Sequence, residues 1–255
     1  MSLPLSLVDA FTDRAFAGNP AGVCVLEKDL DPAFLAAVAQ EMNQAETAFL
    51  LARDDGWGLR WFTPEVEVDL CGHATLASAH LLWETGRAPG DAPIRFHTRS
   101  GLLTARREGR AIVLDFPATP PVAGEVPASL APALGVPQDA FAYTGRTPFD
   151  LFVELGSEAA VRALEPDLNA LGRVPARGIV VTALSGSGSN PDFVSRFFAP
   201  GCGVPEDPVT GSAHCALGPY WSARLGRTAL TGYQASRRGG FVTVTCLGER
   251  VHLSG

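Results

Sequence analysis

The first part of the chain alternates short apolar stretches with a helical pattern. Apolar residues between positions 5 and 26 are interrupted by Gly18-Asn19-Pro20, which predicts two strands joined by a turn. Asp31-Pro32 then predicts a helix start, because Asp caps a helix and Pro fits its first turn. Further apolar runs predict strands over residues 47–51 and 59–62.

Two segments have the composition of buried helices. Residues 72–85 and 211–225 are rich in apolar and small side chains on nearly all sides, and Gly86 and Gly226 follow them as predicted C-terminal caps. A helix that is apolar nearly all round is usually covered on every side. Each segment is therefore predicted to be the central helix of a sheet-based unit.

The second half of the chain repeats the order of elements in the first. Strand patterns at residues 151–155, 179–182 and 193–198 surround a helix predicted at 159–171 and precede the helix at 211–225. We interpret this order as a duplication and predict an α+β fold with two pseudo-symmetric domains, each a β-barrel-like sheet wrapped around a central apolar helix. Chance similarity between two Gly-capped helices is the alternative.

The Pro-rich stretch at residues 117–121 marks the predicted boundary. The domains are then 1–117 and 118–255, and the last strand is allowed to return to the first domain.

Composition narrows the possible partners. The chain has 255 residues, of which 46% are hydrophobic and 18% charged, and its net charge of −7 disfavours nucleic acid. It shows no signal-peptide pattern and no apolar run of about 20 residues, so we expect a cytoplasmic protein without a membrane partner. Five cysteines without a CxxC pair predict reduced thiols.

The starts of the two apolar helices are candidate anion sites. Gly72 and Gly211 each begin a predicted helix, where free backbone amides and the helix dipole favour a carboxylate. Cys71 and Thr210 precede these glycines and are included as candidate substrate contacts. Ordinary helix capping, with Ser212 as a cap, is an equal alternative from the residues alone.

Glu46 is the candidate general base. It opens an apolar strand, and partial desolvation favours the protonated carboxyl that acid–base catalysis needs. The corresponding strand of the second half begins at Gly178 without an acid, so the duplication does not require Glu46. A solvated charge at a strand end is the simpler alternative.

Asp207 and His73 are weaker candidates, each at the start of an apolar helix. Asp207 is interpreted as a stabilising charge for the second helix, as a second acid, or as a residue that orients His73. His73 has one ring nitrogen available to a cleft, although a buried histidine is more often structural.

No cofactor or metal is predicted. Cys71 and His73 are too few for a closed zinc site, and the chain has no P-loop, no GxGxxG motif after a strand and no HExxH motif. The Ser-Gly-Ser-Gly-Ser run at residues 185–189 is interpreted as a flexible loop rather than a phosphate cradle.

Together, several ordered segments resemble the PhzF (phenazine-biosynthesis-like) family, which has the diaminopimelate-epimerase-like fold. They are Glu46-Thr-Ala-Phe, Arg60-Trp-Phe-Thr-Pro, Asp69-Leu-Cys-Gly-His-Ala-Thr, Ser195-Arg-Phe-Phe-Ala-Pro, Glu206-Asp-Pro-Val-Thr-Gly-Ser-Ala-His-Cys and Tyr233-Gln-Ala-Ser-Arg-Arg-Gly-Gly.

The resemblance implies a homodimeric, cofactor-independent isomerase that transfers a proton on a small carboxylate substrate, with its active site between two domains. It places the family's catalytic glutamate on Glu46 and its assisting residues on His73, Asp207 and Ser212. It also implies that Gly72 and Gly211 supply carboxylate-binding amides.

The family's namesake moves a hydrogen between carbons of dihydro-3-hydroxyanthranilate, and two departures make this substrate less expected here. Ala45 stands where relatives often carry a serine, and the chain ends where relatives usually run on through another strand.

Two rival functions are kept open. A thiol epimerase or racemase of the same fold would use Cys71, but Thr210 at the matching position is too weak an acid to replace a second thiol. A small-molecule-binding protein without catalysis is the other rival, and the joint presence of the candidate catalytic residues argues against it.

Overall fold

The computed structural model describes residues 3–90, 92–186 and 190–255. The chain divides into two compact units, one made of residues 1–115 with 254–255 and the other of residues 116–253. This division lies two residues before the boundary predicted from the Pro-rich stretch. The predicted loop at residues 185–189 lies largely outside the described residues.

The first unit is built on one mixed sheet in the order β1-β2-β3-β4-β6-β7-β8, with β5 beside β4. Parallel pairing joins β2 to β3 and β4 to β6, and the other neighbouring strands pair in antiparallel fashion. The strands are β1 (Leu5–Ala10), β2 (Asn19–Leu26), β3 (Glu46–Arg53), β4 (Gly56–Phe62), β5 (Glu67–Val68), β6 (Ile94–Thr98), β7 (Gly101–Glu108) and β8 (Ala111–Pro117).

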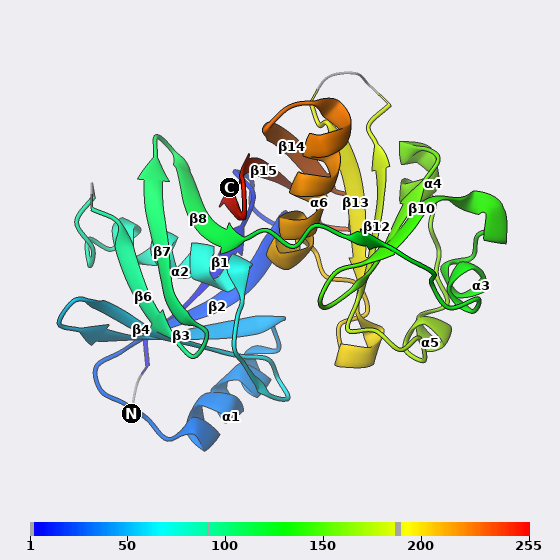
Figure 1. The fold of residues 1–255 in the computed structure, drawn as a ribbon. Coiled ribbons are helices and arrows are strands. Elements are labelled where there is room, and N and C mark those ends of the chain that lie inside the picture. The colour runs from blue at the N-terminus through cyan, green and yellow to red at the C-terminus, as the bar shows by residue number, and fades with distance from the viewer. Residues whose placement is uncertain (1–2, 91, 187–189) are drawn as a thin grey trace. The chain divides into compact units, whose positions relative to one another are not determined.

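The two helices of the first unit lie on opposite sides of strands β3 and β4 (Figure 1). Helix α1 (Pro32–Met42) begins as predicted at Asp31, whose side chain accepts a hydrogen bond from the Ala33 amide, and it packs Leu35 against Phe49. Helix α2 (Gly72–Glu84) buries nine of its residues, as its apolar composition predicts. The end of the chain returns to this unit, where Ile112 and Gly255 exchange two backbone hydrogen bonds.

The second unit has a mixed sheet in the order β9-β10-β11-β12-β13-β14-β15-β16, with parallel pairing of β11 to β12 and of β13 to β14. Its strands are β9 (Val122–Ala123), β10 (Phe141–Arg146), β11 (Leu151–Leu155), β12 (Ile179–Leu184), β13 (Phe193–Phe198), β14 (Ala229–Gln234), β15 (Gly240–Leu247) and β16 (Arg250–Ser254). Its helices are α3 (Leu130–Leu134), α4 (Glu158–Arg162), α5 (Leu168–Leu171) and α6 (Gly211–Leu225), with 3-10 turns η1 (Gln138–Ala140) and η2 (Pro200–Cys202).

Helix α6 lies within the core of the second unit. Its Leu217 and Trp221 are buried against Phe193 and Phe152 of the sheet. The short helices α3, α4 and α5 belong to a separate cluster that contains Leu134, Val161 and Leu171. The strands are therefore covered by two hydrophobic clusters, which explains why their sequences are almost continuously apolar.

The predicted helix at residues 159–171 is wrong, because the structure contains two short helices there, α4 and α5. Pro166 lies in the break, where it has no amide hydrogen to continue a helix. Asp167 then caps α5 by accepting a hydrogen bond from the Ala170 amide. The pattern analysis also placed no element between residues 87 and 150, where β6, β7, β8 and β10 lie.

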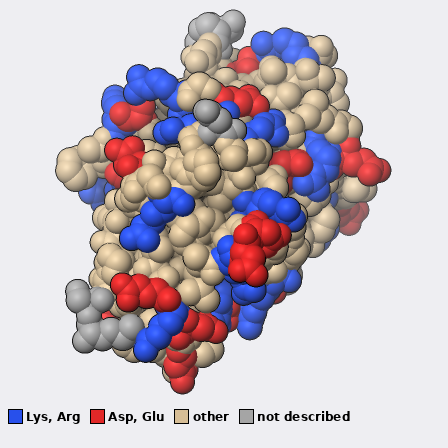
Figure 2. All heavy atoms as spheres, turned by 90° about the vertical axis from the view of Figure 1, so that its left-hand side faces the viewer, with Lys and Arg blue, Asp and Glu red and all other residues tan. Residues whose placement is uncertain are grey.

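The surface seen in Figure 2 carries small groups of basic and acidic side chains close to one another. Among the helices that the structure describes, none is both long and apolar enough to cross a membrane.

Candidate active site

Glu46 is the first residue of β3 and lies at the start of a buried strand. Its backbone pairs with Ala21 of β2, and the residues that follow it, Thr47 to Leu50, are almost fully buried. The Glu46 side chain is 19% exposed. Alternation along the strand directs it to the side of the sheet that α2 covers. The carboxylate is thus partly withdrawn from water while still accessible to it.

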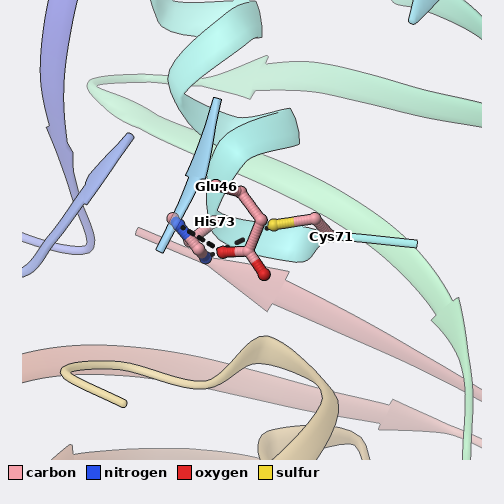
Figure 3. Close-up of side chains that lie close together, drawn as sticks. All are labelled: Glu46, Cys71 and His73. Atoms are coloured by element: carbon pink, nitrogen blue, oxygen red, sulfur yellow. Dashed lines mark hydrogen bonds and ion pairs between the residues drawn. The ribbon is translucent and has the colours of Figure 1, made fainter. Parts of the chain in front are cut away.

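Two side chains at the start of α2 face this carboxylate (Figure 3). His73 Nε2 lies 3.4 Å from Glu46 Oε2, and His73 Nδ1 lies 3.5 Å from Cys71 Sγ. Cys71 occupies the N-cap position of α2, but its side chain makes no capping hydrogen bond. The thiol is therefore directed to the imidazole rather than to the helix backbone.

Burial holds the His73 imidazole in its neutral form. The side chain is 6% exposed, and desolvation lowers the pKa of His73 from 6.5 to about 3. The contact with Glu46 is consequently not an ion pair near neutral pH. A neutral imidazole has one donor and one acceptor nitrogen, and an ionised carboxylate accepts only. A proton on Nε2 would leave Nδ1 free to accept from the Cys71 thiol, which lies within hydrogen-bond distance. Nε2 itself makes no hydrogen bond to a described residue and lies only near the Glu46 carboxylate.

Glu46, Cys71 and His73 are also the group that most resembles a set of metal ligands in the described part of the chain, with their ligand atoms within 4.8 Å of one another. Their contacts use different nitrogens of the ring, because Glu46 approaches Nε2 and Cys71 approaches Nδ1. Three ligands are one fewer than a closed tetrahedral zinc site uses, so this group does not by itself make such a site.

In the second unit, Asp207 and Thr210 join a hydrogen-bonded network at the start of α6. The Thr210 hydroxyl donates to the Asp207 carboxylate, and the Thr210 amide donates to the side chain of Gln234. The Gln234 amide group in turn donates to the Asp207 carbonyl and the Thr210 hydroxyl. Asp207 thus holds the residue before the helix, and its charge also acts on Arg177.

Ser212 has a different partner. Its hydroxyl lies 3.1 Å from Arg177 Nη2, and Arg177 also makes two hydrogen bonds to the buried carboxylate of Asp150. Thr210, not Ser212, occupies the N-cap position of α6, and no side chain caps this helix. The capping alternative for Ser212 is therefore wrong. Gly211 begins the helix as predicted and is buried.

Sequence reasoning did not find Arg177, Asp150 or His214 as neighbours of these residues. His214 is fully buried, its Nδ1 lies 2.8 Å from the Thr210 carbonyl, and burial lowers its pKa from 6.5 to about 4. His214 lies within the Glu206-to-Cys215 segment that carries the family resemblance, so the sequence could have marked it as a residue near the site. Arg177 lies 35 positions before Ser212 and gives no such signal.

Comparisons with known proteins agree with an isomerase of the α+β fold class. The chain belongs to the family of phenazine biosynthesis-like proteins (PhzC-PhzF), which matches residues 8–255. An uncharacterized isomerase of Halalkalibacterium halodurans is 50% identical over all of this chain and 95% of that protein. The predicted family and the predicted isomerase class are confirmed.

Solved structures give the same picture of the fold. A crystal structure of a phenazine biosynthesis protein of the PhzF family from Enterococcus faecalis matches with a TM-score of 0.93 and 41% identity, covering all of this chain and 95% of that one. A probable proline racemase from Agrobacterium radiobacter K84 has the fold alone in common, with a TM-score of 0.62 and 11% identity over 99% of this chain and 88% of that one. The predicted α+β class is confirmed.

The thiol alternative finds little support in the side chains. Thr210 holds the N-cap position of α6 that Cys71 holds in α2. The cysteine within α6, Cys215, is buried, and desolvation raises its pKa to about 12. A thiol with this pKa is a poor source of thiolate.

Proposed function

We propose that this chain is an isomerase that moves a proton between carbons of a small carboxylate-bearing metabolite, without a cofactor, and that Glu46 carries the proton. The observation that supports this proposal most directly is the partly buried Glu46 carboxylate beside a neutral His73. An imidazolium would stabilise the ionised carboxylate and weaken it as a base, whereas a neutral ring positions it without adding a full charge.

The proposed reaction needs one proton and no electron acceptor. Glu46 removes a proton from a substrate carbon, and the bonding electron pair moves into the conjugated system of the substrate. The protonated carboxyl group then returns the same proton to another carbon, which restores the carboxylate. The bond broken and the bond formed are both C–H bonds, so the substrate is rearranged without net oxidation.

We propose that the first backbone amide of α2, at Gly72, helps to bind the substrate carboxylate, since it lies at the positive end of a helix dipole next to Glu46. Cys71 would contribute by orienting His73. The roles that the resemblance gives to Asp207, Ser212, Gly211 and Thr210 in the second unit stay predictions.

We also propose that the two units arose by duplication. Neighbouring strands pair in the same succession in both units, from β1 to β7 in the first and from β10 to β15 in the second. The five pairings are antiparallel, parallel, antiparallel, parallel and antiparallel. Such agreement supports a pseudo-symmetric origin, because chance seldom reproduces five successive pairings.

We propose a cytoplasmic homodimer on the ground of the family resemblance alone. Light scattering at micromolar concentration is expected to give twice the mass of the chain, and a monomeric mass would contradict the homodimer.

Hydrogen exchange in heavy water tests the proposed function. Dihydro-3-hydroxyanthranilate and a panel of cyclohexadiene carboxylates would be incubated with the enzyme and followed by proton NMR. We expect loss of a C–H signal, or its transfer to a neighbouring carbon, with at least one of them. The Glu46→Gln variant should slow this exchange by about 10²–10⁴-fold with its melting temperature nearly unchanged. Exchange within about tenfold of wild type, about 1.4 kcal/mol in barrier, would assign the base elsewhere.

A further inference from the structure

The side of the first sheet that faces away from α2 contains a pocket of about 490 Å³. Strands β3, β4 and β6 supply most of its wall, through residues such as Phe49, Arg60 and His97, and Leu35 of α1 contributes at one end. The volume is within the range of small-molecule sites in proteins.

Gly58 makes room for the charged part of this pocket. It lies in the middle of the wall, paired with Leu51 on one side and His97 on the other. A Cβ at this position would come within 2.7 Å of Arg53 Nε and 3.1 Å of Arg53 Nη2. The absence of a side chain at Gly58 therefore lets the guanidinium group of Arg53 lie across the sheet.

The pocket has an apolar floor with cations around it. Phe49 and Leu35 are almost fully buried beneath it, and Leu51 adjoins them. Three arginines line it, Arg53, Arg60 and Arg99, against a single lining carboxylate, Asp29.

Two of these arginines are already balanced by acids, and the third is not. Arg60 makes a bidentate contact with Glu67 at 2.7 and 2.9 Å, and Arg99 lies 3.2 Å from the same Glu67. Arg53, by contrast, has no ion pair with any residue in ranges 3–90, 92–186 and 190–255. The planar guanidinium group of Arg53 has parallel N–H donors that match the two oxygens of a carboxylate, and its positive charge is available to pair with such a group.

We propose that this pocket is a second binding site, for a small organic carboxylate with an apolar body. The carboxylate head lies against the Arg53 guanidinium over Gly58, and the body lies on Phe49 and Leu51. The site is separate from the candidate active site, because Phe49, Leu51 and Arg53 alternate with the residues of β3 that share the Glu46 side.

Benzoate, with the isosteric neutral benzamide as its control, is a suitable probe for titration by amide-resolved NMR. We expect saturable shifts at the amides of Gly58 and His97, with a dissociation constant of about 1–10 mM for benzoate. Benzamide should bind at least tenfold more weakly, because it has the same body but no negative charge. The Arg53→Gln variant should lose benzoate binding by at least tenfold. Arg106→Gln, which removes a half-buried arginine paired with Glu108 on β7, should leave benzoate binding unchanged.

Gly58→Ala provides a second variant, since the new methyl group displaces Arg53 without removing its charge, and it should also weaken benzoate. Unchanged binding in Arg53→Gln, equal binding of benzamide, or the absence of saturation up to 50 mM benzoate would each overturn the proposal. Chemical-shift changes confined to the amides near Glu46 and His73 would also overturn the proposal, because benzoate would then occupy the candidate active site. Hydrogen exchange by Arg53→Gln should equal that of wild type, so failure here is distinguishable from failure of the proposed function.

Discussion

Glu46 and Cys71 approach opposite nitrogens of the same imidazole, and only one of them is suited to carry the proton. The carboxylate is an acceptor with partial access to water, whereas the thiol lies within hydrogen-bond distance of His73 Nδ1 and can donate to it when that nitrogen carries no proton. The difference between the two side chains follows from their hydrogen-bond roles, since both lie beside the same ring.

Replacing Cys71 with serine tests this division of roles. A serine hydroxyl can still donate to His73 Nδ1, so we expect hydrogen exchange within about tenfold of wild type, against a loss of about 10²–10⁴-fold in Glu46→Gln. Both variants should be measured with the same substrate, and their melting temperatures recorded to show that each is folded. A Cys71→Ser variant as inactive as Glu46→Gln would favour a thiol mechanism.

The two buried histidines should make stability depend on pH. The pKa values of His73 and His214 are lowered to about 3 and about 4 in the folded chain, whereas an unfolded histidine titrates near 6.5. Between these values only the unfolded state takes up the protons, so stability is lost as the pH falls below about 6.5. We expect the free energy of unfolding in urea to decrease by about 1.4 kcal/mol per pH unit for each such histidine near pH 5.

A variant without one of these rings separates the two contributions. The His214→Gln variant should lose roughly half as much unfolding free energy between pH 6 and pH 5 as wild type does, whatever its stability at pH 7. His80→Gln, at an exposed position of α2, is the matched control and should leave the slope as in wild type. A stability that stays constant between pH 7 and pH 5 would contradict the prediction.

Among the elements, α6 shows how close packing outweighs helix propensity. Gly218 lies in the middle of this helix, where a Cβ would collide with the buried side chain of Val244 on β15. Alanine favours a helix over glycine by about 1 kcal/mol. Val244 is β-branched and cannot turn away easily, and overpacking of this kind costs about 1–3 kcal/mol.

We therefore expect Gly218→Ala to lower the free energy of unfolding by up to about 2 kcal/mol, measured by urea denaturation. Gly156→Ala is the matched control, because no atom lies within 4 Å of the added Cβ there. It should leave stability unchanged or raise it by up to about 1 kcal/mol. A stabilised Gly218→Ala variant would mean that α6 and β15 move apart readily.

For the whole molecule, we expect turnover to survive exhaustive chelation and to need no added nucleotide. The physical reason is that a carboxylate can remove and return the proton by itself. The cluster of Glu46, Cys71 and His73 makes the experiment informative, since these side chains are capable of binding a metal ion. Turnover that disappears with chelator and returns with a metal would show that they act as ligands.

Local pattern was sufficient for much of the fold. Apolar periodicity and caps are set by neighbours in the chain, so the helices α1, α2 and α6 and the strands β3, β4, β11, β12 and β13 were predicted close to their observed bounds. The position of Glu46 at the start of an apolar strand was also a local feature. The single predicted helix at residues 159–171 failed because Pro166 and the cap at Asp167 outweighed its apolar spacing.

Only the tertiary structure decided which side chains meet. Glu46 and His73 are 27 positions apart, yet pairing of β3 and packing of α2 bring their atoms to 3.4 Å. The neutral state of His73 likewise depends on burial by many residues, since desolvation is a property of the surroundings. The same holds for the pocket over Gly58, whose walls come from four strands and a helix. A sequence specifies each element through short-range chemistry, whereas contacts across elements depend on how strands pair and how helices cover them.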